Sequence, residues 1–315
     1  LLVLLRVCGL YAHKPASDTH IRYCKTATCR QACYNGFPKG KMMRTPQQAM
    51  KVCVVPFGCQ MNRADASAIR DMMDHAGHDI VTEEDEADAI VYVTCTVRQH
   101  AEDRAMSRLG RHAQRKRDGK RAVLVLAGCV AEKEGSGAFS TIPQLDIVCG
   151  TRKFHLLPQL VAKAAATGEK IVQTGLDELA GAETGLYWRS SKFQAFVTIM
   201  RGCDNFCSYC IVPYTRGREY SREPSDIIED VRELAQLGVK EITFLGQNVN
   251  SYGKGLDSNH SLADILAMAH EVSGIERIKF VTSHPKDLSR PLVEALNLPK
   301  VCSYLHLPTQ SGSSR

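Results

Sequence analysis

The sequence predicts an α/β protein built from two folded segments in series. Short apolar runs rich in β-branched residues alternate with longer stretches of helical periodicity, which is the pattern of βαβ units around a parallel sheet. The length of 315 residues corresponds to two domains at roughly 150 residues each. Apolar residues make up 44% of the chain, enough to fill two cores, which excludes a disordered or collagen-like protein.

The charge and the cysteine content narrow the class of protein further. There are 40 basic and 34 acidic residues, and the net charge of +6 permits a nucleic-acid partner without requiring one. No apolar run approaches the ~18 residues needed to cross a bilayer, so we expect no membrane partner. The 13 cysteines are an odd number in a long chain, whereas secreted disulfide scaffolds are shorter and pair their cysteines evenly. We therefore expect a cytoplasmic protein that uses thiolates to bind metal.

Residues 1–50 show no sustained period of 2 or 3.6. We expect this stretch to be an unstructured extension. The alternative is a small metal-binding knuckle formed by Cys24, Cys29 and Cys33.

The first folded segment, residues 51–165, contains strands and helices in alternation. The predicted strands are Val52–Phe57, Ala89–Thr94, Ala122–Ala127 and Leu145–Val148, and the predicted helices are Ala64–His75, Arg98–Arg117 and Leu156–Ala166. Ligands of such parallel sheets bind beyond the carboxyl ends of the strands.

Three cysteines lie at that edge of the predicted sheet. Cys59, Cys95 and Cys129 each follow one strand, 36 and 34 residues apart, so the fold would bring them together. Gly58 and Gly128 precede two of them, where the backbone must turn sharply from strand to helix. Three thiolates around one crevice suit a 4Fe-4S cluster with one iron left open. The alternative is a set of ordinary buried cysteines.

Residues 166–190 form a predicted linker with one short strand at Lys170–Gln173, and residues 191–315 form the second segment. There, Cys203, Cys207 and Cys210 give the pattern CxxxCxxC directly after the predicted strand Ala195–Met200. Three closely spaced thiolates can hold three corners of a 4Fe-4S cluster. Zinc is the alternative, although structural zinc sites usually take four protein ligands.

The rest of the second segment repeats in βα steps. We predict helices at Ser225–Gly238, Ser261–Val272 and Pro291–Leu296, the first capped by Ser225, and strands at Glu241–Leu245, Arg277–Thr282 and Tyr304–Leu307. With Ala195–Met200 these make four barrel-type strands, and active-site loops are expected at their carboxyl ends.

Seven motifs in order resemble the methylthiotransferase family of radical S-adenosylmethionine (SAM) enzymes. They span about residues 52–315 and read FGCQMN, TCTVRQHAE, AGCVAEK, RGCDNFCSYCIVPYTRGREYSR, LGQNVNSYG, TSHP and LHLPTQSGS. Within the family they are most similar to the enzymes that act on N(6)-isopentenyladenosine in tRNA. Thr94 departs from the family pattern, which usually has Asn before the second cysteine.

The resemblance implies a fold class and a domain plan. It implies an N-terminal flavodoxin-like parallel sheet domain with an auxiliary cluster over residues 51–165, followed by an incomplete radical SAM (β/α) partial barrel over residues 191–315. The superfamily's barrel has six strands, and full-length relatives add a tRNA-holding TRAM domain, which is absent here. We therefore expect this fragment by itself to be inactive on tRNA.

The resemblance also assigns site residues. The auxiliary 4Fe-4S cluster falls on Cys59, Cys95 and Cys129, and the radical-generating 4Fe-4S cluster on Cys203, Cys207 and Cys210. The residues expected to contact the cofactor SAM are Tyr209, Gln247, Asn248, Ser283, His284 and Gln310. Arg216 and Arg218 follow the cluster loop, from which they could reach a carboxylate or phosphate of the substrate; the alternative is a structural turn with surface charge. No side chain is expected to act as a catalytic acid or base.

The implied reaction adds a methylthio group to carbon 2 of N(6)-isopentenyladenosine next to the anticodon and consumes two SAM molecules. One SAM would methylate a cluster-bound sulfur and the other would generate the radical. The partners implied are tRNA, an electron donor such as flavodoxin or ferredoxin, and a sulfur source. The alternatives are a methylthiotransferase acting on threonylcarbamoyladenosine tRNA or on a ribosomal-protein aspartate, and a non-catalytic metal-binding nucleic-acid module.

Overall fold

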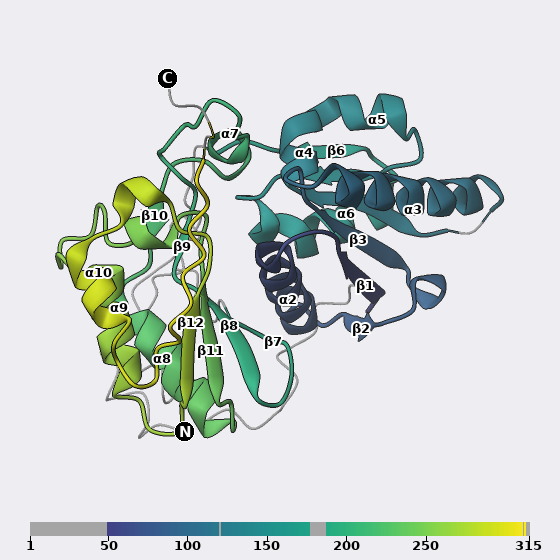
Figure 1. Cartoon of the computed structure of the whole chain (residues 1–315). Coiled ribbons are helices and arrows are strands. Elements are labelled where there is room, and N and C mark those ends of the chain that lie inside the picture. Colours follow the sequence, from purple (N-terminus) through teal and green to yellow (C-terminus); the bar gives the residue numbers. More distant parts are fainter. Residues whose placement is uncertain (1–48, 120, 177–186, 311, 313–315) are drawn as a thin grey trace, which may run out of the picture. The chain divides into compact units, whose positions relative to one another are not determined.

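The computed structural model describes residues 49–119, 121–176, 187–310 and 312. Residues 1–48 of the predicted extension, with its three cysteines, lie outside the described residues. Residues Gln47–Arg315 form one compact unit (Figure 1). Its described residues form two large sheets, of six and four strands, and a two-stranded sheet of β9 (Met200–Arg201) and β10 (Tyr220–Ser221). None of the described helices combines the length and the apolar character needed to span a membrane.

The first sheet has six strands, all parallel, in the order β2-β1-β3-β4-β5-β6. Its first five positions have the flavodoxin-like order, which confirms the predicted fold. The strands are β1 (Lys51–Pro56), β2 (Asp79–Val81), β3 (Ala89–Thr94), β4 (Val123–Gly128), β5 (Ile147–Cys149) and β6 (Ile171–Gln173). The helices of this half are α2 (Gln60–His75), α3 (Gln99–Arg117), α4 (Cys129–Glu134), α5 (Ala138–Thr141) and α6 (Leu157–Thr167).

Helices cover both faces of this sheet because successive strand residues point to opposite sides. Val52 and Val54 of β1 join the core formed with α2 and α6. Cys53, between them, joins the core formed with α3, α4 and α5. Both faces are thus buried, which explains why the strands are continuous apolar runs.

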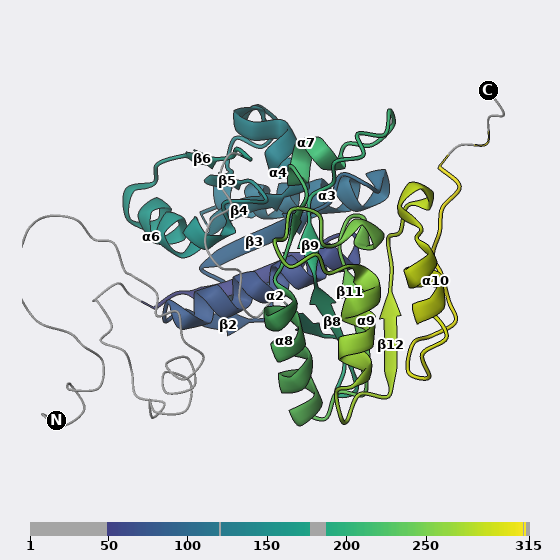
Figure 2. The same ribbon diagram turned by 90° about the vertical axis from the view of Figure 1, so that its left-hand side faces the viewer.

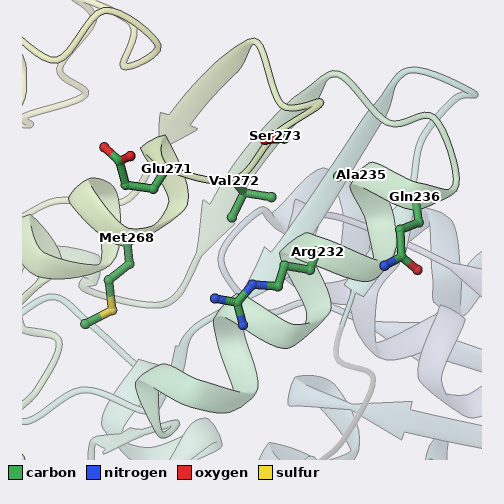
Figure 3. A pocket seen from close by; sticks show the side chains of 7 residues that line it. All are labelled: Arg232, Ala235, Gln236, Met268, Glu271, Val272 and Ser273. Carbon is green, nitrogen blue, oxygen red and sulfur yellow. The ribbon is translucent and has the colours of Figure 1, made fainter.

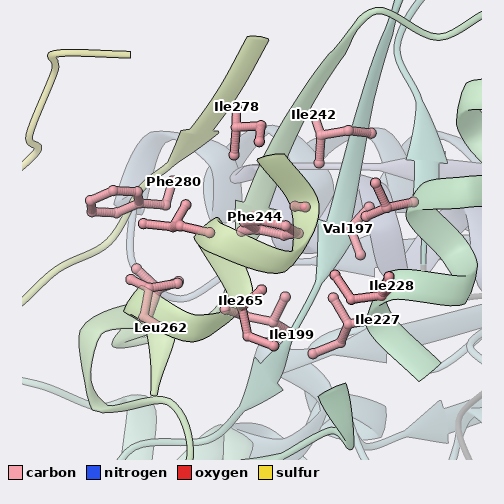
Figure 4. Packing of buried hydrophobic residues seen from close by; sticks show 14 of the residues in the cluster. Val197, Ile199, Ile227, Ile228, Ile242, Phe244, Leu262, Ile265, Ile278 and Phe280 are labelled. Carbon is pink, nitrogen blue, oxygen red and sulfur yellow. The ribbon is translucent and has the colours of Figure 1, made fainter. Parts of the chain in front are cut away.

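The second sheet has the order β12-β11-β8-β7. Strands β8 (Gln194–Thr198), β11 (Glu241–Leu245) and β12 (Arg277–Phe280) are parallel, and β7 (Tyr187–Arg189) pairs antiparallel with β8. The helices α8 (Pro224–Gln236), α9 (Leu262–His270) and α10 (Arg290–Ala295) contribute side chains to its core. Figure 4 shows Phe244 of β11 within this core, near Ile265 of α9.

Two predicted segments differ from the structure. The prediction of a strand at Tyr304–Leu307 is wrong. Backbone pairing with β12 stops at a single bridge between Ile278 and Val301, and Tyr304 is exposed. The fourth strand of this sheet is instead β7. The short strand predicted within the linker is β6, and its pairing with β5 makes it part of the first sheet.

Helix α2 packs against both sheets (Figure 2). Its residues Met61 and Ala64 are buried together with Leu245 at the end of β11. Trp188 and Phe196 of the second sheet stack with ring centroids 5.0 Å apart and pack against the same cluster. The helix that follows the first predicted site cysteine therefore also contacts the sheet that precedes the second set of cysteines.

Candidate functional site

The three dispersed cysteines follow neighbouring strands of the first sheet, and we call them the sheet-edge triad. Cys59 precedes α2 after β1, Cys95 follows β3, and Cys129 begins α4 after β4. The strand order changes direction between β1 and β3, which is where doubly wound sheets bind ligands. Cys95 and Cys129 are buried and Cys59 is half-buried.

Two glycines allow these cysteines to approach one another. Gly58 has φ of +112°, and a Cβ atom there would lie 2.3 Å from the Cβ of Cys95. Gly128 has φ of +94°, and its Cβ would lie 2.7 Å from the carbonyl oxygen of Thr94. Only glycine fits either position, as the turn argument from the sequence predicted.

The thiols of Cys59 and Cys95 interact directly. Their side-chain interaction raises the pKa of Cys59 and lowers the pKa of Cys95. The backbone N–H groups of Val97 and Arg98 also point to Cys95 and lower its pKa further. Cys95 is therefore predisposed to be a thiolate, the form in which cysteine binds metal.

Several buried polar side chains lie around the sheet-edge triad. The Asn62 Oδ1 atom accepts from the Cys59 thiol at 3.2 Å, and the Arg216 Nε atom donates to Cys129 Sγ at 3.2 Å. The Arg216 guanidinium also forms an ion pair with the fully buried carboxylate of Asp65, at 2.7 Å between Nη1 and Oδ2. A residue of the second half thus reaches the cysteines of the first.

The compact set of cysteines, the loop triad, follows β9 (Met200–Arg201). Cys203 is buried, while Cys207 and Cys210 are half-buried. Burial raises the pKa of the Cys203 thiol, and the neighbouring thiols of Cys210 and Cys207 raise it further. A turn joins the last two cysteines, since the Cys210 N–H donates to the Cys207 carbonyl at 2.9 Å.

Contacts at both ends of the loop fix its path. The Gly202 N–H donates to Gln247 Oε1 at 2.6 Å, so this predicted cofactor residue holds the loop backbone. A Cβ at Gly202 would lie 2.1 Å from the carbonyl oxygen of Arg218. Phe206, next to Cys207, has φ of +46°, a backbone conformation that residues other than glycine rarely adopt.

Three further predicted cofactor residues follow β11 and β12. The His284 Nε2 atom lies 3.7 Å from Cys207 Sγ. Asn248 donates through Nδ2 to Asp287 Oδ2 at 2.7 Å, but its Oδ1 atom is buried with no hydrogen-bond partner. The Ser283 Oγ atom is likewise buried with no partner. Unsatisfied buried polar atoms are costly, so these two are candidates to bind a polar ligand.

The last two predicted cofactor residues line one hollow of about 540 Å³. Its lining consists of Tyr209, which lies between Cys207 and Cys210 in the sequence, and of Pro308, Thr309, Gln310 and Gly312. The structure thus brings Tyr209 and Gln310 together, although 100 residues separate them in the sequence. The hollow adjoins the loop triad because Tyr209 lies between two of its cysteines in the sequence.

Another hollow, of about 480 Å³, lies between the ends of α8 and α9 (Figure 3). Its lining includes Arg232, Met268 and Glu271, and it contains no cysteine or histidine. It lies between the helices and not at the strand ends, so we do not count it as part of the site.

The two predicted substrate residues have different surroundings. Arg218 is 73% exposed, forms an ion pair with Asp204, and lies with its guanidinium carbon 5.4 Å from the ring centroid of Phe206. The side chain of Arg216 is only 4% exposed and points into the protein. Its contacts are with Asp65 and Cys129, and the contact with the substrate stays a prediction.

Both triads provide thiols as donors, which suits an iron-sulfur cluster. Among the described residues, no group of three or more His, Cys, Asp or Glu side chains converges closely enough to hold one metal ion. A four-iron cluster keeps its thiolates further apart than a single ion does. The close approaches at Gly58 and Gly128 and the partnerless atoms of Asn248 and Ser283 are compatible with a cluster and a polar cofactor.

Three polar residues near the two triads were not predicted from the sequence. Asn62 and Asp65 follow Cys59 at intervals of three residues, so all lie on one side of α2, and this spacing was a readable signal. Glu219 has a buried Oε1 atom with no hydrogen-bond partner, and burial raises its pKa. Its only sequence signal was its place in the motif that follows the loop triad.

Two family models match the chain. Residues 51–150 match the Uncharacterized protein family UPF0004, and residues 197–315 match the Radical SAM superfamily. The first range covers the sheet-edge triad, and the second covers the loop triad.

Curated relatives match most of the described residues. Proteins called tRNA-2-methylthio-N(6)-dimethylallyladenosine synthase from Clostridium perfringens and Geotalea uraniireducens are 43% identical over 267 residues and 44% identical over 264 residues. These matches cover 84% and 82% of this chain. The chain spans about 60% of the length of these relatives.

Solved structures share the fold at low identity. A radical S-adenosylmethionine methyltransferase, TsrM, from Kitasatospora setae superposes with a TM-score of 0.55 at 13% identity, covering 80% of this chain and 58% of that one. The cobalamin-dependent S-adenosylmethionine radical enzyme OxsB gives a TM-score of 0.54 at 10% identity, covering 80% and 42%. These similarities confirm the α/β fold.

The fold and the two matched models define a radical SAM protein with an additional N-terminal sheet domain. Over most of its length the chain is similar to the curated methylthiotransferases named above. The match to the Radical SAM superfamily supports SAM and an iron-sulfur cluster as cofactors.

Proposed function

We propose that this chain carries the two cluster sites of a tRNA methylthiotransferase that modifies carbon 2 of N(6)-isopentenyladenosine beside the anticodon. The sheet-edge triad holds an auxiliary 4Fe-4S cluster, and the loop triad holds the cluster that binds SAM. When bound, these groups supply sulfur and radical chemistry, respectively.

One observation carries the proposal: a single side chain belonging to the loop-triad motif contacts the sheet-edge triad. Arg216 follows Cys210 by six residues and donates to Cys129 Sγ at 3.2 Å. A methylthio transfer needs the sulfur-donating group and the radical-generating group to act on the same carbon. The contact between Arg216 and Cys129 joins the loop-triad motif to the sheet-edge triad, which is consistent with this requirement.

The residues around the loop triad have distinct tasks in this proposal. Asn248 and Ser283 provide buried oxygen atoms for the amino group of SAM, and Tyr209 and Gln310 enclose it. Gln247 holds the loop through its contact with Gly202. Arg218 and the exposed ring of Phe206 lie beside the loop triad and suit a phosphate and a base of the substrate.

The partners follow from this reaction class. The substrate is tRNA, as the names of the curated relatives indicate for those proteins. The reaction also requires a one-electron donor such as flavodoxin or ferredoxin and a source of sulfur. We propose that the protein acts in the cytoplasm, where these partners occur.

A chimaera tests the proposed reaction. Residues 51–315 of this chain would be joined to the remaining part of the Clostridium perfringens relative and expressed in a strain that lacks its own enzyme. Mass spectrometry of digested tRNA should then detect the 2-methylthio form of N(6)-isopentenyladenosine, and Cys203→Ala in the chimaera should abolish it. If only unmethylthiolated base accumulates while the complete relative restores the modification, the proposed function is wrong.

A further inference from the structure

We propose that Arg216 is a positioning residue that holds positive charge against the sheet-edge triad and thereby sets the reduction potential of the cluster bound there. The inference rests on the proposed function, because it needs that cluster. It assigns this residue a role other than the substrate contact that the sequence suggested.

The guanidinium of Arg216 directs each of its three nitrogen atoms at a group of the first domain. Nε donates to Cys129 Sγ at 3.2 Å, and Nη2 donates to Asn62 Oδ1 at 3.4 Å. Nη1 lies 2.7 Å from Asp65 Oδ2, an ion pair outside hydrogen-bond geometry. Since the Cys59 thiol also donates to Asn62 Oδ1, Arg216 contacts one thiol directly and a second through Asn62.

The carboxylate of Asp65 interacts with two arginines, Arg216 and Arg201. Asp65 is fully buried, and its other carboxylate oxygen accepts from Arg201 Nη1 at 2.9 Å. Burial acts to lower the pKa of Arg216, but Asp65 and the thiols of Cys129 and Cys59 raise it above its usual value. A buried guanidinium therefore faces the thiols, and in a region of low dielectric its charge acts strongly on any charge that develops there.

Reduction adds one negative charge to a cluster. A fixed cation in contact with one of its thiolates stabilises the reduced form more than the oxidised form, which raises the reduction potential. The charge of Arg216 therefore favours electron uptake, and the charge of Asp65 opposes it.

The backbone that carries Arg216 is fixed to the first domain. Thr151 Oγ1 donates to the carbonyl of Thr215 at 2.6 Å, and Arg152 donates to the carbonyls of Arg216 at 3.3 Å and Arg218 at 2.9 Å. A Cβ at Gly217 would lie 2.6 Å from the Arg152 Nη2 atom, so this contact is as close as a glycine permits.

The same segment also touches the loop triad. The Gly217 carbonyl accepts from the Cys203 N–H at 3.2 Å. Residues 215–218 thus connect the first domain to the backbone of the loop triad, and Arg216 occupies a defined position between the two thiol sets.

The test uses the full chain with Cys203, Cys207 and Cys210 replaced by Ala, so that only the sheet-edge cluster is present. Its midpoint potential would be measured by an anaerobic redox titration followed by electron paramagnetic resonance. Arg216→Gln should lower the equilibrium constant for one-electron reduction about tenfold, which is a shift of 59 mV. Arg216→Lys keeps the positive charge and should have a midpoint potential close to that of the parent protein.

Asp65→Asn provides a change of opposite sign. It removes the negative charge that offsets Arg216, so the midpoint potential should rise. A loss of packing at either position would not produce shifts in opposite directions. Arg218→Gln is the control, because this arginine is 73% exposed and its ion pair is with Asp204, and the potential should not change.

Each outcome has one meaning. Iron content is measured first, and a parent protein whose sheet-edge triad holds no iron contradicts the proposed function itself. With iron present, an unchanged potential in Arg216→Gln, or shifts of the same sign in Arg216→Gln and Asp65→Asn, overturns the role of Arg216 alone. If Arg216→Gln loses its cluster, Asp65→Asn decides, and a potential that does not rise overturns the proposal.

Discussion

The carboxylate of Asp287 accepts from three side chains: Asn248 at 2.7 Å, Lys286 at 3.0 Å and Lys254 at 3.1 Å. Burial acts to raise the pKa of Asp287, but these hydrogen bonds outweigh burial and lower the pKa to about 2. The charged carboxylate therefore stabilises the fold above the usual pKa of about 4. That contribution is lost as the pH falls from about 4 toward 2.

We expect Asp287→Asn to destabilise the protein by about 1 kcal/mol at pH 7, the usual scale for a lost hydrogen bond, since both lysines are exposed and their ion pairs contribute little. Denaturant unfolding at pH 7, 4 and 3 would measure the difference between the two proteins. The difference should be constant from pH 7 to about 5 and shrink between pH 4 and 3. A difference that stays the same at pH 3 would show that the charge of Asp287 is not responsible.

Gly128 is the residue at which the backbone turns into Cys129. Its φ of +94° and ψ of −153° belong to a region almost restricted to glycine, and the added Cβ would meet Thr94. We expect Gly128→Ala to cost about 2–3 kcal/mol of unfolding free energy and to lower the iron content. Gly168→Ala is the matched control, because Gly168 also has positive φ, of +68°, but open space around it. Equal losses in the two variants would contradict the argument from close approach.

Helix starts provide a prediction at the scale of the element. The sequence predicted that Ser225 caps α8, but the helix begins after Glu223, so Ser225 lies inside its first turn. In α9, Ser261 is the N-cap, and both its N–H and its hydroxyl donate to Asp264 Oδ2, at 2.7 and 2.8 Å. Thermal unfolding should show a loss of about 1 kcal/mol for Ser261→Ala and only a few tenths for Ser225→Ala. The reverse order would mean that the first turn of α8 is misplaced.

The elements that the sequence predicted well are those with a long apolar run. Strands β3 and β11 have the predicted bounds, Ala89–Thr94 and Glu241–Leu245, because each is buried along its whole length. Elements that were missed, such as β2, α4 and α5, have three to six residues, too few for a period to be visible. Tyr304–Leu307 has a strand-like composition, but no described strand pairs with it, and pairing depends on tertiary context.

At the scale of the whole molecule, the βαβ arrangement accounts for the part of the site that the sequence predicted. The strand ends placed Cys59, Cys95 and Cys129 together because carboxyl ends of parallel strands share one edge. The contact of Arg216 with Asn62 was not predictable in this way, because 154 residues separate them and the contact depends on how the two halves pack. Helix α2 makes that packing possible, since it contacts both sheets.

The central claim is that the two triads hold separate clusters with different tasks. Two triple variants, each with one triad replaced by Ala, would be reconstituted anaerobically, and their iron content and SAM cleavage to 5′-deoxyadenosine would be measured. Replacing Cys203, Cys207 and Cys210 should remove about half of the iron and abolish cleavage, whereas replacing Cys59, Cys95 and Cys129 should remove the other half and leave cleavage measurable. A triple variant that retains all of its iron would contradict the claim.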